Sequence, residues 1–300
     1  MATWVPPAPL LLVALSAFVP GATAAVTVDG RLDPDYGPAI SVQTTQTSFV
    51  DANPAYSPDP IRYADGSELD VAYGLIADGA LHLFLAGNLG FCCPTMYSHQ
   101  ERFEIFIDSR ASGQHTLRAD NAAAALNALA GLTFDAGFLP DYWLACTLNM
   151  SCRYAELLAG GGGVGYDLGY NLVGAPGTLT GGTNPIGVLA AVDNSNGAGE
   201  TAGCGPASGA GVTTGVEWAI PLAAIGDPRD CVTVSVFVTN VDSHALGNQV
   251  LGPLSPGTCA LGAPAGVDFS TLAGAQTFTV CSGPTPARPD TWGRLKTIYR

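Results

Sequence analysis

Alternation of apolar and polar residues along the chain predicts a protein built from β-strands. Residues 101–108 (ERFEIFID) show the pattern most clearly, and Phe103, Ile105 and Ile107 are expected on one buried face. Residues 231–240 (CVTVSVFVTN) repeat it, with valines alternating against Thr and Ser. Both segments are therefore predicted strands with one face in a hydrophobic core.

A hairpin is predicted at residues 69–76 and 80–89. Asp78-Gly79 lies between these two alternating runs, and this dipeptide is typical of a tight hairpin turn. Because side chains alternate along a strand, the leucines of the second run should share one face, with His82 and Phe84 on the other.

A strand ending at a corner is predicted at residues 215–226 (GVEWAIPLAAIG). Alternation predicts Trp218 in the core. Pro221 cannot donate to a strand ladder and suits the first turn of a short helix, which Gly226 can close in a left-handed conformation. This segment is therefore expected to be a sheet corner.

The remaining segments predict one helix and further strands. Asp120 to Gly131 is the expected helix, with Asp120 as N-cap, Leu126 and Leu129 inward, and Gly131 as its stop. About a dozen strands with this one inserted helix predict an all-β fold, an antiparallel, jelly-roll-like β-sandwich over residues 25–281. The other predicted strands lie within residues 26–36, 40–47, 134–147 and 276–281.

An apolar run at the start of the chain predicts a signal peptide at residues 1–24. Leu10 to Phe18 is apolar, and Ala22-Thr23-Ala24 fits the small-residue cleavage rule. A transmembrane helix needs about 20 apolar residues, more than any segment offers. We therefore expect a secreted or surface-exposed protein with no transmembrane segment.

Eight cysteines in the predicted mature chain favour disulfides formed in an oxidising compartment. No CxxC pair is present, which argues against a zinc site. Cys146 and Cys152 are the predicted local disulfide, because they close a short loop. The sequence leaves the pairing of the others open: Cys92, Cys93, Cys204, Cys231, Cys259 and Cys281.

The charge of the chain limits its partners. A formal net charge of −14, from 11 basic and 25 acidic residues, excludes nucleic acid and anionic membranes as natural partners. Residues 282–300 differ, with a Pro-rich linker followed by a short basic amphipathic segment. Three interpretations of this tail stay open: a sorting or surface-attachment signal, a segment docked on its own domain, or a frayed terminus.

Three motifs follow one another along the chain. Residues 28–36 contain VDG, LD and a final Tyr; residues 103–108 read FEIFID; residues 217–221 read EWAIP before Gly226. In this order they resemble the opening, central strand and corner of family 9 carbohydrate-binding modules and their DOMON-like relatives. The resemblance implies an extracellular antiparallel β-sandwich used for binding or display, not catalysis. The region between the second and third motifs is expanded, and we expect any ligand to be held there.

Tyr142 and Trp143 are the candidate ligand-binding residues. Sugar CH faces stack on aromatic rings, and these rings follow a polar Pro140-Asp141 pair. Adjacent strand residues point to opposite faces, so the alternative is that one of the two belongs to the core.

Carboxylates in Gly-containing turns form the candidate metal site. Ca²⁺ prefers several hard oxygen ligands, and Asp65, Glu68 and Asp70 in DGSELD supply them. The alternative is that Asp serves here as a turn former on an acidic protein, and EF-hand spacing is absent. A second carboxylate group comprises Asp29, Asp33 and Asp35.

No catalytic motif is found in the sequence. G-x-S-x-G and H-E-x-x-H are absent, and Glu104 and Glu217 lie on predicted solvent faces with nothing to bring them together as a glycosidase pair. Haem, which one DOMON-like branch binds through Met and His, would draw on scattered residues. Those residues are Met96, Met150, His82, His99, His115 and His244.

The sequence therefore predicts a secreted, non-catalytic module that binds carbohydrate or a cell-surface glycan, with Ca²⁺ as a candidate cofactor. A structural protein of the cell envelope or extracellular matrix, without a small ligand, is the alternative. A hydrolase of an unrecognised type is the third hypothesis.

Overall fold

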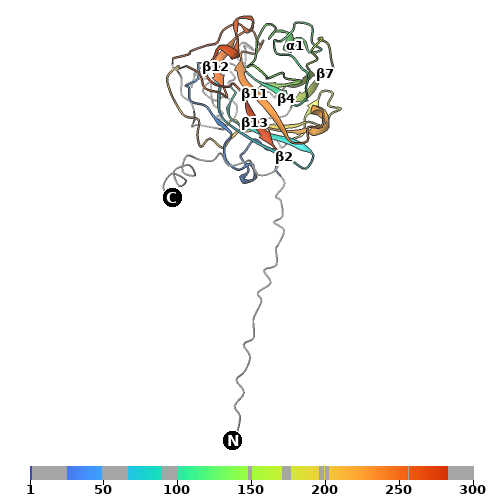
Figure 1. Cartoon of the computed structure of the whole chain (residues 1–300), viewed down its shortest axis with the longest axis vertical. Helices are drawn as coiled ribbons and strands as arrows, with labels where there is room; N and C mark the ends of the chain where they lie inside the picture. The colour runs from blue at the N-terminus through green and yellow to red at the C-terminus, as the bar shows by residue number, and fades with distance from the viewer. Residues whose placement is uncertain are drawn as a thin grey trace.

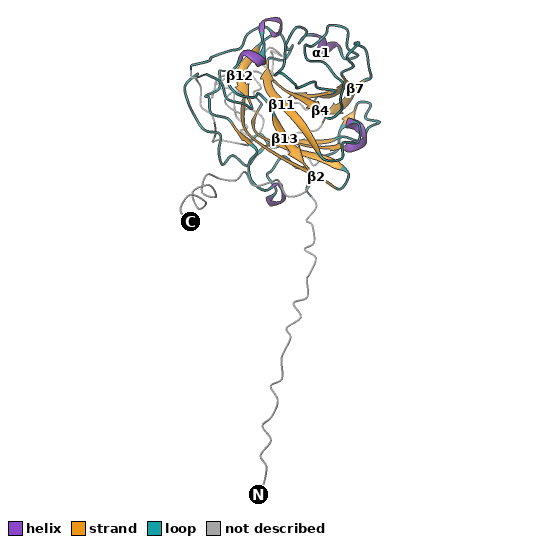
Figure 2. Ribbon diagram, in the orientation of Figure 1, coloured by secondary structure: helices purple, strands orange, loops and turns teal. Residues whose placement is uncertain are grey.

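The computed structural model describes residues 1, 26–48, 67–89, 101–147, 151–170, 177–195, 199, 203–255 and 257–282. They form two antiparallel β-sheets that pack face to face, with short helical turns around them (Figures 1 and 2). The predicted all-β sandwich is confirmed. Several predictions lie outside the described residues: the signal peptide beyond Met1, the tail after Ser282, and Asp65, Cys92, Cys93, Met96, His99 and Met150.

The smaller sheet has five strands in the order β1-β2-β3-β10-β9. β2 and β3 form the predicted hairpin, and its turn holds Asp78 and Gly79 at φ 51° and 76°, the positive values that a type I′ turn requires. β10 lies between β3 and β9 near the middle of the sheet. The strands are β1 (Ser41–Val42), β2 (Glu68–Ala77), β3 (Ala80–Asn88), β9 (Leu189–Val192) and β10 (Gly215–Pro221).

The larger sheet has the order β12-β11-β4-β5-β6-β7-β8. β12 and β13 pair with different parts of the same side of β11, β13 with its first half and β12 with its end. In Figure 1, β11 runs diagonally across the sandwich between β4 and β13. The strands are β4 (Arg102–Asp108), β5 (Tyr142–Thr147), β6 (Cys152–Glu156), β7 (Gly165–Tyr170), β8 (Thr180–Gly181), β11 (Cys231–Thr239), β12 (Leu246–Val250) and β13 (Phe278–Cys281).

The main core lies between the two sheets. The predicted alternation of β4 is confirmed, because Phe103, Ile105 and Ile107 all belong to this core. Trp218 of β10 is fully buried there, as predicted. Burying a large apolar side chain contributes about 1.5–3 kcal/mol, so these alternating positions hold the sheets together.

A second core covers the outer face of the larger sheet. Phe106 and Trp143 point into it and contact the loop-rich segment that contains α1 (Ala124–Asn127). The predicted helix over 120–131 is wrong in extent, although Leu126 and Leu129 are buried as expected. The described residues also form the short helices η1 (Pro34–Tyr36), η3 (Leu222–Ile225), η4 (Pro264–Gly266) and η5 (Phe269–Thr271).

The N-terminal segment crosses the outer face of the smaller sheet instead of adding a long strand. Residues 26–36 make one bridge, Arg31 to Thr214, and then enter η1, whose Tyr36 is buried against Phe84. The strand expected over residues 40–47 is reduced to β1 and a bridge at Thr45. The two predicted strands are therefore corrected to isolated bridges and the two-residue strand β1.

The corner after β10 is confirmed. β10 ends at Pro221, η3 follows directly, and Gly226 closes it at φ 80° in the left-handed region. Tyr154 of β6 donates a hydrogen bond from its hydroxyl to the Ala224 carbonyl at 2.7 Å, which fixes this corner to the larger sheet.

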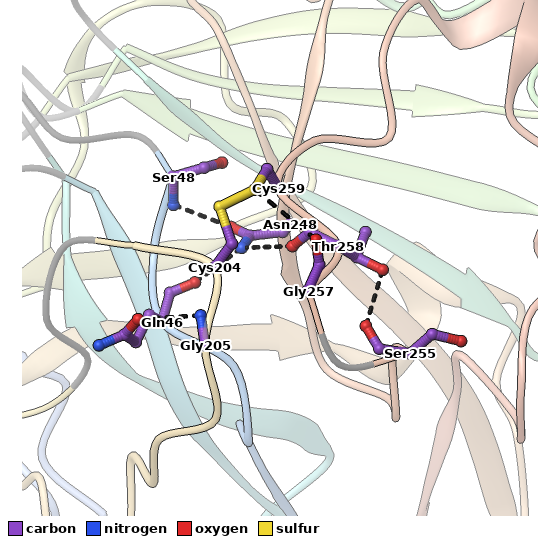
Figure 3. The surroundings of a disulfide bond; sticks show 9 residues. All are labelled: Gln46, Ser48, Cys204, Gly205, Asn248, Ser255, Gly257, Thr258 and Cys259. Atoms are coloured by element: carbon purple, nitrogen blue, oxygen red, sulfur yellow. Dashed lines mark hydrogen bonds between the residues drawn. A yellow bond between two sulfur atoms is a disulfide. The ribbon is translucent and has the colours of Figure 1, made fainter.

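Among the described residues, two disulfides join segments far apart in sequence. Cys231–Cys281 links β11 to β13, and Cys204–Cys259 links two loops beside Asn248 (Figure 3). The second bond tethers the Gly-rich run around Cys204. No described helix has the length and apolar character needed to cross a bilayer.

Antiparallel pairing places the first residues of some strands and the last residues of others at the same end of the sandwich. β2, β4, β6, β10 and β12 start there, and β3, β5, β7, β9 and β11 finish there. Ser67 donates to Glu101 at 2.9 Å and Leu69 donates to the Gln249 side chain at 3.0 Å, so both sheets meet at this end. We call it the polar end.

Candidate functional site

The predicted aromatic platform is buried. Tyr142 is 2% exposed and lies in the core between the sheets, while Trp143 is 0% exposed and lies in the outer core. The two rings do point to opposite faces, but a covering segment hides the second face as well. This corrects the expectation that one ring would be open to a ligand.

Glu104 is a buried structural carboxylate on the outer face of the larger sheet. It accepts hydrogen bonds from Trp143 Nε1 at 2.7 Å, Thr239 Oγ1 at 2.9 Å and Ser243 Oγ at 2.7 Å. Arg102 Nη1 lies 3.8 Å from the same carboxylate. The expected solvent position is wrong, because the loop after β11 covers it.

Glu217 has the equivalent role on the outer face of the smaller sheet. Its carboxylate accepts from the backbone N–H groups of Asp29 and Gly30, at 2.8 and 3.0 Å, and from the Tyr36 hydroxyl at 2.8 Å. Burial raises the pKa of Glu217 to about 7, and these hydrogen bonds act against that rise. Glu217 therefore anchors the N-terminal segment.

Gly30 shows how closely this segment approaches the sheet. Its φ is +83°, and a Cβ there would lie 2.7 Å from the Val192 carbonyl carbon and collide with the Asp193 amide nitrogen. Only glycine fits without moving backbone. The Asp29-Gly30 motif and the Glu217 motif thus meet in space because their hydrogen bonds hold the N-terminal segment on the sheet.

The two glutamates cannot act as a catalytic pair. Glu104 and Glu217 are both 0% exposed and lie on the outer faces of different sheets, separated by the main core. Each already binds several donors of the fold. Paired glycosidase carboxylates must instead face one substrate across about 5–10 Å.

The candidate metal ligands that the structure describes are buried in β2. Glu68 accepts from Asn88 Nδ2 at 3.1 Å, and Asp70 lies at a β-bulge between Leu69 and Val71. Within the described residues no group of three or more His, Cys, Asp or Glu is gathered as metal ligands.

Two of the N-terminal aspartates bind backbone N–H groups of their own segment. Asp29 accepts from the Arg31 N–H at 2.9 Å, and Asp33 accepts from the Thr27 N–H at 2.8 Å. These contacts support the turn-former alternative for this second group.

Tyr170 is the exposed aromatic ring. Among the described Phe, Tyr and Trp residues it alone is largely open to solvent, at 48%. It ends β7 and pairs with Thr180 of β8. Its ring lies against Gly181, where any side chain would collide with the Tyr170 ring carbons.

Exposed polar residues lie on the same two strands as Tyr170. Thr180 is exposed on β8 directly opposite Tyr170, and Asp167 is exposed on β7 three positions before it, paired with Arg153 across the β6–β7 ladder. We call Asp167, Tyr170, Thr180 and Gly181 the Tyr170 edge. It lies where β7 reaches the polar end and belongs to the expanded region in which a ligand was expected.

Tyr170 is inconspicuous in the sequence. Its segment, GYDLGY, alternates weakly, and strand β7 carries a register shift opposite Cys152 and Arg153. The glycine pair at 181–182 opposite the tyrosine was the available signal, because glycines beside an aromatic residue in a sheet leave room for its ring.

Comparison with known proteins found no matching family model, no matching curated protein and no matching solved structure. The candidate site therefore depends on the chain's own geometry.

Proposed function

We propose that the protein is a secreted, non-catalytic binding protein whose ligand is a carbohydrate held at the Tyr170 edge. The observation that carries the proposal is the open Tyr170 ring, which lies against Gly181 opposite Thr180, with the exposed Asp167 on the same strand. A sugar ring stacks its CH face on such a ring while neighbouring carboxylates and hydroxyls bond its hydroxyl groups.

The use of the buried carboxylates supports binding over catalysis. Glu104 and Glu217 each hold parts of the fold together, and neither reaches the Tyr170 edge. The two disulfides support secretion, because such bonds persist in oxidising compartments.

The test compares Tyr170→Ala with Tyr170→Phe and with Leu189→Ala. Leu189 is an exposed apolar residue on the edge strand of the other sheet, so it serves as the matched surface control. The probes are a glycan array and insoluble cellulose, chitin and xylan. Tyr170→Ala should weaken binding about tenfold, while Tyr170→Phe keeps the ring and most of the affinity.

Equal binding by wild type and Tyr170→Ala would place the ligand elsewhere. No binding to any of these probes would reject the carbohydrate proposal.

A structural role is the second candidate. Leu158 and Val164 are two exposed apolar residues on the β6–β7 hairpin. The two arms of this hairpin pair through the hydrogen bond from Glu156 N to Val164 O at 2.8 Å. Ordered self-association in sedimentation experiments, lost in a Leu158→Ser/Val164→Ser variant and accompanied by no glycan binding, favours this role.

A further inference from the structure

Cys146 and Cys152 lie directly opposite each other in neighbouring strands. β5 and β6 pair without a register shift from Tyr142–Glu156 to Cys146–Cys152. Both side chains are fully buried in the core between the sheets, and both are unbonded thiols in the structure. The predicted bond between them therefore stays a prediction, and the question is whether the ladder geometry permits it.

Backbone hydrogen bonds define the type of position that the two cysteines occupy. Leu157 N donates to Asp141 O at 2.7 Å, whereas Glu156 N donates to Val164 O at 2.8 Å on the opposite side. Odd-numbered residues of β6 therefore bond to β5 and even-numbered ones to β7. Cys152 faces Cys146 as a non-hydrogen-bonded pair, the arrangement in which opposite side chains come closest.

The chain contains a bonded example of the same arrangement. Cys231 and Cys281 are opposite each other in β11 and β13, and Ser282 N donates to Asp230 O at 2.7 Å one position away. Cys231–Cys281 is thus also a non-hydrogen-bonded pair. Its Cα atoms are 4.0 Å apart and its sulfurs are joined.

We propose that Cys146 and Cys152 form a disulfide of their own, in addition to the two bonds among the described residues, and that it links strands β5 and β6. Each thiol loses one proton and one electron as the S–S bond forms. A disulfide such as oxidised glutathione accepts the two electrons and is reduced to two thiols.

Burial determines when this bond forms. Burial and the adjacent Cys146 thiol raise the pKa of Cys152, so the reactive thiolate is scarce in the folded protein. An external oxidant also cannot reach a sulfur enclosed between two sheets. The bond forms while the chain folds and not afterwards, unlike Cys231–Cys281, where Cys231 is exposed.

The first experiment maps disulfides in the full chain secreted into an oxidising compartment or refolded with reduced and oxidised glutathione. The protein is denatured, alkylated without reduction, digested and analysed by mass spectrometry. We expect the Cys146 and Cys152 peptides to be linked, or unalkylated within one peptide. Both cysteines fully alkylated, with Cys204–Cys259 and Cys231–Cys281 intact as internal controls, overturns the proposal.

The second experiment tests the timing. Protein folded in reductant is transferred to oxidised glutathione under native conditions, and the alkylation of each cysteine is followed. Cys231 and Cys281 should rejoin while Cys146 and Cys152 stay reduced, and brief unfolding should let the second pair join. Equal rates for both pairs overturn the timing. A Cys146→Val/Cys152→Val variant should fold with the other two disulfides intact, showing that neither readout reflects misfolding.

Discussion

Individual buried polar residues hold the covering segments of this protein against the two sheets. Alternation along β4 and β10 correctly predicts which side chains enter the main core, but it assigns Glu104 and Glu217 to solvent. Their faces are covered by segments more than a hundred positions away in sequence, the loop at Ser243 and the segment ending at Tyr36. A local pattern contains no information about such distant coverage.

Replacing Glu217 should show the value of this anchor. Glu217→Ala leaves two backbone N–H groups and the Tyr36 hydroxyl without their acceptor, and we expect a loss of roughly 3–5 kcal/mol in the free energy of unfolding. Glu217→Gln keeps an acceptor oxygen and should lose about 1 kcal/mol. Urea denaturation measures both. Asp35→Ala, an exposed acid of the same segment, is the control and should change little.

At the scale of elements, strands were easier to predict than the segments between them. The helix expected at 120–131 shrinks to one turn, because Asp120 pairs with Arg118 at 2.7 Å instead of capping. The Asn127 side chain also bonds the Asn121 backbone N–H and carbonyl, at 2.8 and 3.0 Å. The spacing of Leu126 and Leu129 correctly predicted that both are buried. The side-chain bonds of Asp120 and Asn127 take the place of the backbone hydrogen bonds that a longer helix would have made.

One edge of the sandwich is closed by an amide side chain. Asn248 of β12 donates to the carbonyls of Gln46 and Thr258, at 2.7 and 3.0 Å, and accepts from Ser48 N at 2.9 Å (Figure 3). The Cys204–Cys259 disulfide lies beside these contacts.

Asn248→Ala should therefore destabilise the protein by roughly 2–4 kcal/mol, because three backbone groups lose their partner. Hydrogen exchange should quicken first at residues 46–48 and 257–259. Ser255→Ala, on the exposed side of the same loop, is the control. Unchanged exchange at both segments contradicts this role for Asn248.

At the scale of the whole molecule, buried carboxyl groups determine how stability responds to pH. Burial raises the pKa of Glu217 to about 7 and raises the pKa values of Asp108, Asp135 and Asp141 above their usual range. The folded state then binds protons more tightly than the unfolded chain. Stability should rise as pH falls from about 7 towards 4.5, which is the ordinary pKa of Glu217.

Glu217 alone should contribute about 3 kcal/mol to this change. Urea denaturation at pH 8 and pH 5 measures it, with Glu217→Gln as the matched variant. Wild type should be more stable at pH 5, and the difference between the two pH values should shrink in the variant. If the stability difference between pH 5 and pH 8 were the same in wild type and variant, the pKa of Glu217 would be the same in the folded and unfolded states.

The sandwich followed from alternation, but the candidate ligand site did not. Tyr142 and Trp143 are the more conspicuous aromatic residues, yet the surrounding chain buries both. Tyr170 became a candidate only through its exposure and its contact with Gly181, which a short irregular strand pairing creates. Surface sites formed by weak edge strands leave little trace in a hydrophobic pattern.

The position of Glu217 has a consequence for biosynthesis. Its partners in residues 29–36 are made early, but they have no acceptor until β10 has been synthesised, and β3 also lacks its β10 neighbour until then. The smaller sheet therefore cannot be completed while most of the chain is emerging from the ribosome. Until that point the N-terminal segment and the β2–β3 hairpin lack the strand that joins them, so the two meet only after residue 217 has been made.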